Sequence, residues 1–254
     1  LHHAASDGDF NMVKWLLNAK AEVDARDAQA ETPLMLAACR SDQVVRLLLS
    51  ANAKADAVSK TDKTTFANSI IYNRLDIFRL LSNTESPVDF RDEKGKTLLM
   101  SAAKSYESVF LHYLLVKKAQ VNTQDNDGCT ALMYAVKQGH SVHVQVLLRA
   151  KADVEIRDKE GATALSIAVQ NNLEQIVKML IDANACIDVQ DCNGMTPLLL
   201  SMENRNKELM SHLLAKNASV NLKNKAGMTP LMYATRWNDM STVSTLLAAR
   251  ASAE

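Results

Sequence analysis

The sequence predicts an all-α protein made of stacked repeats, each consisting of a turn followed by two short antiparallel helices. One phrase built around a threonine returns with a period of 33 residues, with a single interval of 32. Hydrophobic residues form 47% of the chain but aromatic residues only 5%, a composition that suits closely packed short helices. The recurring threonines are Thr32, Thr64, Thr97, Thr130, Thr163, Thr196 and Thr229.

Residues 125–157 show how each element of one repeat arises. A turn is predicted at residues 125–128, where Asp and Asn side chains can bond their own backbone and a glycine can adopt positive φ. Thr130 is the expected N-cap of a first helix over residues 131–136. A second helix is predicted over residues 141–149, because its apolar residues fall on one face at helical spacing.

Eight such units are expected to form one domain over residues 1–254. Their approximate bounds are 1–26, 27–58, 59–91, 92–124, 125–157, 158–190, 191–223 and 224–254. Neither helix of a unit is long enough to be stable alone, so each pair must bury apolar surface against its neighbours. Alanines in the first helix permit close approach, and leucine pairs such as Leu147-Leu148 in the second are expected to fill the core. Fully burying one leucine contributes roughly 1.5–3 kcal/mol.

Imperfect copies of a single phrase carry a family resemblance. Thr-Pro-Leu occurs at residues 32–34, 196–198 and 229–231, and related Gly-x-Thr-x-Leu phrases occur at residues 95–99, 128–132 and 161–165. On these phrases the whole chain resembles an ankyrin repeat array. The resemblance implies an ankyrin-repeat solenoid of helix-turn-helix units with β-hairpin-like turns.

The position after each second helix departs from the family pattern, which usually has Gly-Ala there. The residues in place of glycine are Lys20, Asn52, Glu85, Lys118, Lys151, Asn184, Asn217 and Arg250. If this position is left-handed, each residue other than Gly or Asn should cost on the order of 1 kcal/mol. Either the departure is compensated elsewhere, or the array is marginally stable and depends on partners or further repeats.

The unit at residues 64–92 departs most from the repeated phrase. Thr64-Thr65-Phe66 replaces Thr-Pro-Leu, and Pro87 follows the second helix. This unit is either a relaxed structural repeat or a place where the stack presents a special surface. Ile71 and Tyr72 are expected at groove-facing positions.

Composition and charge argue against several classes of partner. Lys plus Arg and Asp plus Glu are both 29, so the chain lacks the basic excess typical of nucleic-acid or lipid-head-group binding. Apolar stretches of only a few residues predict no membrane insertion. The four cysteines form no CxxC pair, which favours a reducing compartment, the cytoplasm or alternatively the nucleus. Both ends of the chain are abrupt, so we expect a segment of a longer array.

No catalytic, cofactor-binding or metal-binding residues are predicted, so the chain is expected not to be an enzyme. Gly95-Lys96-Thr97 resembles the end of a P-loop, but Phe90 stands where that motif requires glycine. The histidines on second helices have no Cys, Asp or Glu at metal-ligand spacing.

Two sets of positions are predicted to line the concave face and bind a partner. Those at the turn tips are Lys94, Lys96, Asn126, Cys129, Lys159, Glu160, Met195, Lys225 and Met228. Those at the ends of the first helices are Lys104, Lys137, Gln138, Gln170, Asn171, Glu203, Asn204, Arg236 and Trp237. Trp and Arg are enriched among interface hot spots, which singles out Arg236 and Trp237. The alternative is that Trp237 packs against a further repeat.

The function predicted from these features is a protein-binding scaffold or adaptor without catalytic activity, whose partner has no assigned identity. The alternative is a regulatory ankyrin segment of a larger enzyme or ion channel, in which a neighbouring domain performs the chemistry.

Overall fold

A computed structural model describes residues 1–61, 64–82 and 88–252. Contacts between residues divide the chain into two compact units, Leu1–Asn126 and Asp127–Glu254. In each unit the described residues form short helices joined by turns and loops, without a named strand. The all-α class predicted from the sequence is therefore confirmed.

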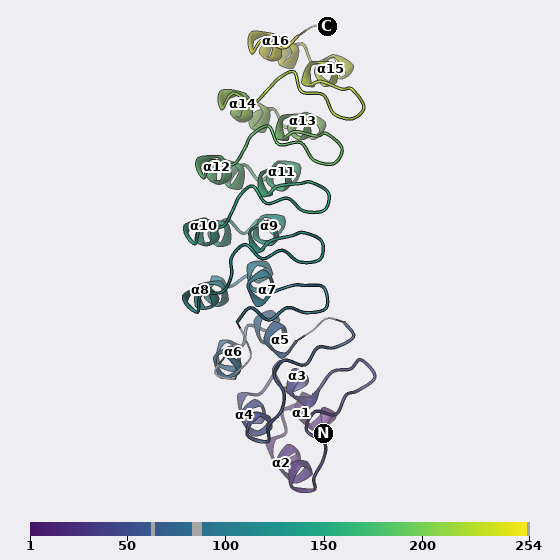
Figure 1. Cartoon of the computed structure of the whole chain (residues 1–254), viewed down its shortest axis with the longest axis vertical. Coiled ribbons are helices and arrows are strands. Elements are labelled where there is room, and N and C mark those ends of the chain that lie inside the picture. Colours follow the sequence, from purple (N-terminus) through teal and green to yellow (C-terminus); the bar gives the residue numbers. More distant parts are fainter. Residues whose placement is uncertain (62–63, 83–87, 253–254) are drawn as a thin grey trace. The chain divides into compact units, whose positions relative to one another are not determined.

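Unit Leu1–Asn126 is a series of helix pairs. Its helices are α1 (His2–Asp7), α2 (Phe10–Asn18), α3 (Pro33–Ala37), α4 (Asp42–Ser50), α5 (Thr65–Ile71), α6 (Leu75–Leu81), α7 (Leu98–Lys104) and α8 (Ser108–Val116). The first helices pack in the order α1, α3, α5, α7, and the second helices α2, α4 and α6 pack in parallel order (Figure 1).

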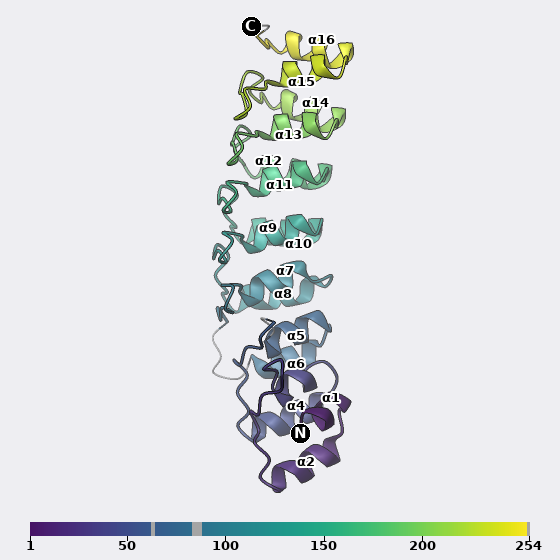
Figure 2. The ribbon, with the colours of Figure 1, turned by 90° about the vertical axis from the view of Figure 1, so that its right-hand side faces the viewer.

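Unit Asp127–Glu254 repeats the same arrangement. Its helices are α9 (Ala131–Lys137), α10 (Ser141–Arg149), α11 (Ala164–Gln170), α12 (Glu174–Asp182), α13 (Pro197–Glu203), α14 (Lys207–Ala215), α15 (Pro230–Arg236) and α16 (Met240–Ala248). The first helices α9, α11, α13 and α15 pack in that order and lie beside the long loops (Figure 1). Pairs such as α9–α10 and α11–α12 form successive layers of this unit (Figure 2). Helix α10 has the bounds expected from the sequence.

The recurring threonines start the first helices, as predicted. Each hydroxyl accepts a hydrogen bond from the backbone amide three residues later, at 3.0–3.3 Å. All seven threonines are at most 7% exposed. A buried helix amide without a hydrogen-bond partner is unfavourable, so each of these helices begins at a residue whose side chain can accept that bond. The period of the threonines therefore equals the spacing between the starts of these helices.

Consecutive turns are joined by what we call the turn-to-turn hydrogen bond. In unit Asp127–Glu254 the amide of Lys159 donates to the Asp127 carbonyl at 2.9 Å. The same bond joins Cys192 to Glu160, Lys225 to Asn193, and, in the other unit, Asn126 to Lys94 and Lys60 to Gln29. The approach is so close that a Cβ on Gly128 would lie 2.9 Å from the Asp158 Cα. A side chain at residue 128 would therefore collide with the next turn.

One leucine of each second helix from α4 to α16 forms the core between layers, whereas α2 buries Val13. These leucines are Leu48, Leu81, Leu114, Leu147, Leu180, Leu213 and Leu246, each at most 2% exposed. The expectation that the following leucine is also core was too broad, because Leu148 and Leu214 are half-buried and Leu247 is 47% exposed. Adjacent helical residues point about 100° apart, so the leucine that follows the core leucine lies at the edge of the buried face.

The most divergent repeat is packed as a normal helix pair, α5–α6. Its core is aromatic: the Phe78 ring meets Phe66, Phe110 and Tyr113 edge to face at centroid distances of 5.9, 5.4 and 5.3 Å. The buried side chain of Asn68 donates to the Met35 carbonyl at 3.0 Å. Pro87 lies outside the described residues. The divergence therefore reflects a different way of filling the core.

The residues after the second helices are left-handed, which is the condition on which the expected strain depended. The φ values are 63° to 65° at Lys20, Asn52, Lys118, Lys151, Asn184, Asn217 and Arg250. Glu85, the remaining predicted case, lies outside the described residues. Asn tolerates this conformation better than Lys or Arg, whose side chains clash with the backbone.

Ala30 occupies a second strained position, in the turn before α3. Its φ is 57°, and its amide donates to the Asp27 carbonyl. The equivalent residues of other turns are Gly95, Gly128, Gly161, Gly194 and Gly227, with φ of 73° to 79°. Alanine therefore stands where the turn favours glycine.

We expect Lys151→Gly to raise the free energy of unfolding by about 1 kcal/mol, because it relieves the left-handed strain at φ 64°. Asn184→Gly, at the same φ of 64°, is the matched control and should change stability by only a few tenths of a kcal/mol. Urea denaturation followed by circular dichroism measures both. Equal effects of the two substitutions would contradict the strain argument.

Ala30→Gly should likewise stabilise the protein by about 1 kcal/mol, and Gly227→Ala should destabilise it by a similar amount. Gly227 isolates the backbone contribution, because a Cβ built there meets no heavy atom within 4 Å. Thermal unfolding of the two variants tests this. A Gly227→Ala variant with wild-type stability would show that φ near 75° is tolerated here by any residue.

Candidate functional site

The predicted binding positions recur in register along each unit. Turn-to-turn hydrogen bonds connect the tips, and the packing of α9, α11, α13 and α15 brings the ends of these helices side by side (Figure 1). Each repeat of unit Asp127–Glu254 therefore offers one turn tip and one helix end to the same surface.

Most of the predicted residues are exposed. These are Lys94, Lys104, Asn126, Lys137, Gln138, Lys159, Glu160, Gln170, Asn171, Glu203, Asn204, Lys225 and Arg236. Lys96, Met228 and Trp237 are half-buried. A partner approaching either unit along these positions would meet mainly polar and charged side chains.

Cys129 and Met195 are exceptions, because they are only 4% and 7% exposed. Both directly precede a motif threonine, at the point where the turn folds back on the helix. The Lys137 ammonium donates to Cys129 Sγ at 3.1 Å, and the Asn224 amide of the next turn donates to Met195 Sδ at 3.5 Å. These neighbours cover the two sulfur atoms. The prediction of an exposed binding role for Cys129 and Met195 is therefore corrected.

Some exposed residues also hold adjacent repeats together. The side-chain amide of Asn204 donates to the carbonyls of Val169 and Gln170 at 3.1 and 2.9 Å. Lys137 forms an ion pair with Asp158 at 3.9 Å in addition to its bond to Cys129. Changing Asn204 or Lys137 would therefore disturb the stack as well as the surface.

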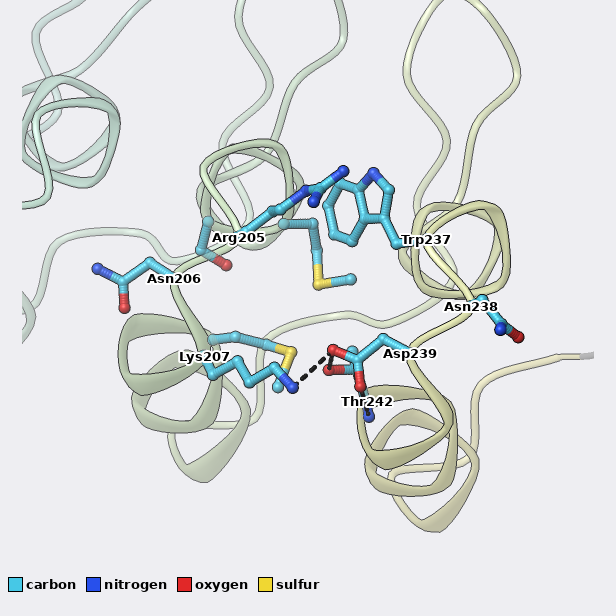
Figure 3. A pocket seen from close by; sticks show the side chains of 10 residues that line it. Arg205, Asn206, Lys207, Trp237, Asn238, Asp239 and Thr242 are labelled. Carbon is cyan, nitrogen blue, oxygen red and sulfur yellow. Dashed lines mark hydrogen bonds and ion pairs between the residues drawn. The ribbon is translucent and has the colours of Figure 1, made fainter.

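A pocket of about 380 Å³ lies between the pairs α13–α14 and α15–α16 (Figure 3). Its lining consists of Ser201, Met202, Arg205, Asn206, Lys207, Met210, Trp237, Asn238, Asp239 and Thr242. Buried methionines and the half-buried Trp237 provide apolar surface, and charged side chains border it. Pockets that combine apolar surface with a few polar groups are typical of binding sites.

Arg205 and Trp237 form one side of this pocket (Figure 3). The guanidinium carbon of Arg205 lies 5.1 Å from the centroid of the Trp237 ring, within range of a cation–π interaction. The Tyr233 ring lies 5.5 Å from the Trp237 ring. Trp237 thus contacts the preceding repeat through Arg205.

Lys207 and Asp239 form the other side (Figure 3). Lys207 Nζ lies 2.7 Å from Asp239 Oδ2. The same carboxylate caps α16, because it accepts hydrogen bonds from the Thr242 amide at 3.2 Å and the Thr242 hydroxyl at 2.9 Å. The bond from Lys207, followed by those from Thr242, lowers the pKa of Asp239 from 3.8 to about 2.

Sequence reasoning found Trp237 but missed Arg205, Lys207 and Asp239. A signal for Arg205 was present, because Asn73, Gly139, Asn172 and Asn238 occupy the equivalent loop position at multiples of the repeat period. The ion pair of Lys207 with Asp239 joins two successive repeats and has no equivalent phrase elsewhere in the chain.

A family model of ankyrin repeats matches overlapping segments that together cover the chain, at residues 1–92, 41–125, 69–158, 99–191 and 165–254. The chain belongs to the ankyrin repeat family. Ankyrin repeats are a general protein-interaction module and are generally non-catalytic, so the expected type of function is protein binding.

Three curated relatives match parts of this ankyrin array. Serine/threonine-protein kinase 12 of Arabidopsis thaliana is 33% identical over 32% of this chain and 18% of its own length. Putative palmitoyltransferase ZDHHC13 of Danio rerio is 32% identical over 47% of this chain and 19% of its own. Inversin of Homo sapiens is 31% identical over 44% of this chain and 11% of its own. In each case the match spans less than a fifth of the relative.

Within residues 1–61, 64–82 and 88–252, no helix combines the length and apolar character needed to cross a membrane. The same part of the ankyrin array brings together no group of three or more His, Cys, Asp or Glu side chains suited to holding a metal ion.

We expect Asp239→Asn to lower the stability of the protein above about pH 4, with the difference from wild type narrowing as the pH falls toward 2. The folded-state pKa of Asp239 is depressed to about 2 from 3.8, so the stabilisation is complete above 3.8 and is lost on protonation. Asparagine keeps one oxygen to cap the Thr242 amide but removes the charge and the oxygen that accepts from Lys207 and the Thr242 hydroxyl. Urea denaturation of both proteins over this pH range measures the difference in their free energies of unfolding. A difference in the free energy of unfolding that does not change with pH would contradict the ion pair between Lys207 and Asp239.

Proposed function

We propose that this chain is a non-catalytic scaffold or adaptor that binds a partner protein through its turn tips and first-helix ends. Membership of the ankyrin repeat family supports protein binding. The in-register exposure of Lys137, Gln170, Glu203 and Arg236 within unit Asp127–Glu254 supports the choice of surface. The cysteine pattern favours action in a reducing compartment, the cytoplasm or nucleus.

The observation that carries the proposal is an apolar patch in unit Leu1–Asn126. Ile71 is 64% exposed and Tyr72 is 53% exposed at the end of α5, where the repeats of α9, α11 and α13 carry the polar pairs 137–138, 170–171 and 203–204. Tyr106, in the loop between α7 and α8, is 93% exposed. Ile71 and Tyr106 line a pocket of about 380 Å³ together with Lys104. Clustered exposed apolar side chains are typical of surfaces that a partner covers.

The relatives favour a second candidate, a regulatory ankyrin segment of a larger enzyme. Two of them have names that denote a kinase and a putative palmitoyltransferase, and the ankyrin match covers only 18% and 19% of their lengths. Sequencing the gene on both sides of this segment would distinguish this candidate from a separate adaptor.

The double substitution Ile71→Ser and Tyr72→Ser should reduce capture of the partner from an extract of the source cells by at least about tenfold. The reason is that two exposed apolar contacts at an interface centre are each worth on the order of 1–2 kcal/mol. Quantitative mass spectrometry of the captured proteins measures the loss.

Val116→Ser is the matched control, because Val116 is an 80% exposed apolar residue on the second helix α8. It should retain the partner, and both variants should keep the wild-type circular dichroism spectrum. Equal capture by the double variant and the control would refute binding through this patch.

A further inference from the structure

The pocket between α13–α14 and α15–α16 has an unbalanced charge. Arg205, Lys207 and Asp239 are its charged lining residues. Lys207 and Asp239 neutralise each other at 2.7 Å. Among the described residues no carboxylate lies within 4.0 Å of the Arg205 guanidinium, which lies over the Trp237 ring. The pocket therefore presents one cation that a ligand can neutralise.

Arg205 is also unusual in its backbone conformation. Its φ is 54°, and the equivalent residues Asn73, Asn172 and Asn238 have φ of 53°, 56° and 54°. Asparagine adopts this conformation readily, whereas arginine is strained in it. Asparagine would satisfy the fold, so the requirements of the backbone do not explain an arginine here.

The shape and chemistry of the pocket suit a segment of a longer chain. Its volume of about 380 Å³ lies at the small end of the range for ligand pockets, roughly 300–1,000 Å³. Met202 and Met210 line the pocket but are only 2% and 4% exposed, so the half-buried Trp237 offers most of the apolar surface that a ligand can contact. Arg205, Lys207 and Asn238 are exposed at its border, so an occupant would remain open to solvent on that side.

We propose that this pocket binds a short acidic peptide segment of the partner. One apolar side chain of the segment lies against Trp237, and a neighbouring Asp or Glu carboxylate binds Arg205. The inference rests on the proposed partner-binding function and names the chemistry that one part of the surface recognises. The ion pair between Lys207 and Asp239 keeps the opposite side neutral, so the acidic preference comes from Arg205.

Selection from a phage-displayed library of random peptides tests the proposal. Peptides enriched on the wild-type protein should place Asp or Glu next to a large apolar residue. A synthetic copy of the most enriched peptide should lose about tenfold or more in affinity on Arg205→Asn, because a hydrogen-bonded charge pair is removed. Arg205→Asn should unfold at no lower urea concentration than wild type, because asparagine fits the left-handed φ.

Two further variants separate recognition from folding. Arg149→Asn removes an exposed arginine from α10 and should leave peptide affinity within about twofold of wild type. Arg205→Glu should invert the selection and enrich basic peptides with an apolar neighbour, a result that loss of folding cannot produce. The proposal is overturned if no peptide is enriched, if the enriched peptides lack acidic residues, or if they bind Arg205→Asn as tightly as wild type.

The outcome is distinguishable from failure of the proposed function, because the capture experiment uses Ile71 and Tyr72 of the other unit. If the wild-type protein captures a partner through Ile71 and Tyr72 but the peptide selection fails, only the proposal of an acidic-peptide pocket is rejected. Failure of both would reject protein binding by either surface.

Discussion

Burial between consecutive helix pairs is the constraint on which the structure depends. The longest described helices have nine residues, below the roughly 12–15 needed for an isolated helix to be stable. Each pair is therefore stable only through its neighbours, as in other repeat proteins. Two contacts set the register within a unit: the buried leucine of the second helices from α4 onward and the turn-to-turn hydrogen bond. With both fixed, exposed residues at equivalent positions face the same surface, and this makes an extended binding site possible.

The parts of the fold that depend on local chemistry could be predicted from the sequence. Thr130 as a helix cap and α10 at Ser141–Arg149 both follow from hydrogen bonding and apolar spacing within a few residues. Burial of individual surface positions was less predictable, because it depends on the next repeat. Met195 is covered by Asn224 of the following turn, a contact that no property of Met195 itself reveals. The pocket was missed for the same reason, since the pairing of Lys207 with Asp239 joins two repeats.

The strained positions show which properties belong to the repeat and which belong to the residue. Lys118, Asn184 and Arg250 have φ of 63°, 64° and 65° although their side chains differ in size and charge. The packing of the helix pairs therefore imposes the backbone conformation. A poorly suited residue raises the free energy of the folded state without changing φ. Arg205 follows the same rule at φ 54°. Because the backbone there is fixed by the fold, the side chain is free to be selected for what it contacts.

The position of the acidic-peptide pocket couples recognition to the stability of the array. Its lining comes from two successive pairs, with Arg205 and Lys207 on one and Trp237 and Asp239 on the other. In a repeat protein the stability is close to a sum of terms for each repeat and for each interface between neighbours. A ligand that touches both pairs binds only when their interface is formed, so it stabilises that interface by RT ln(1 + [L]/Kd). Separation of α15–α16 from α13–α14 then competes directly with peptide binding. Any substitution that loosens this interface weakens recognition even when it leaves every contact residue unchanged.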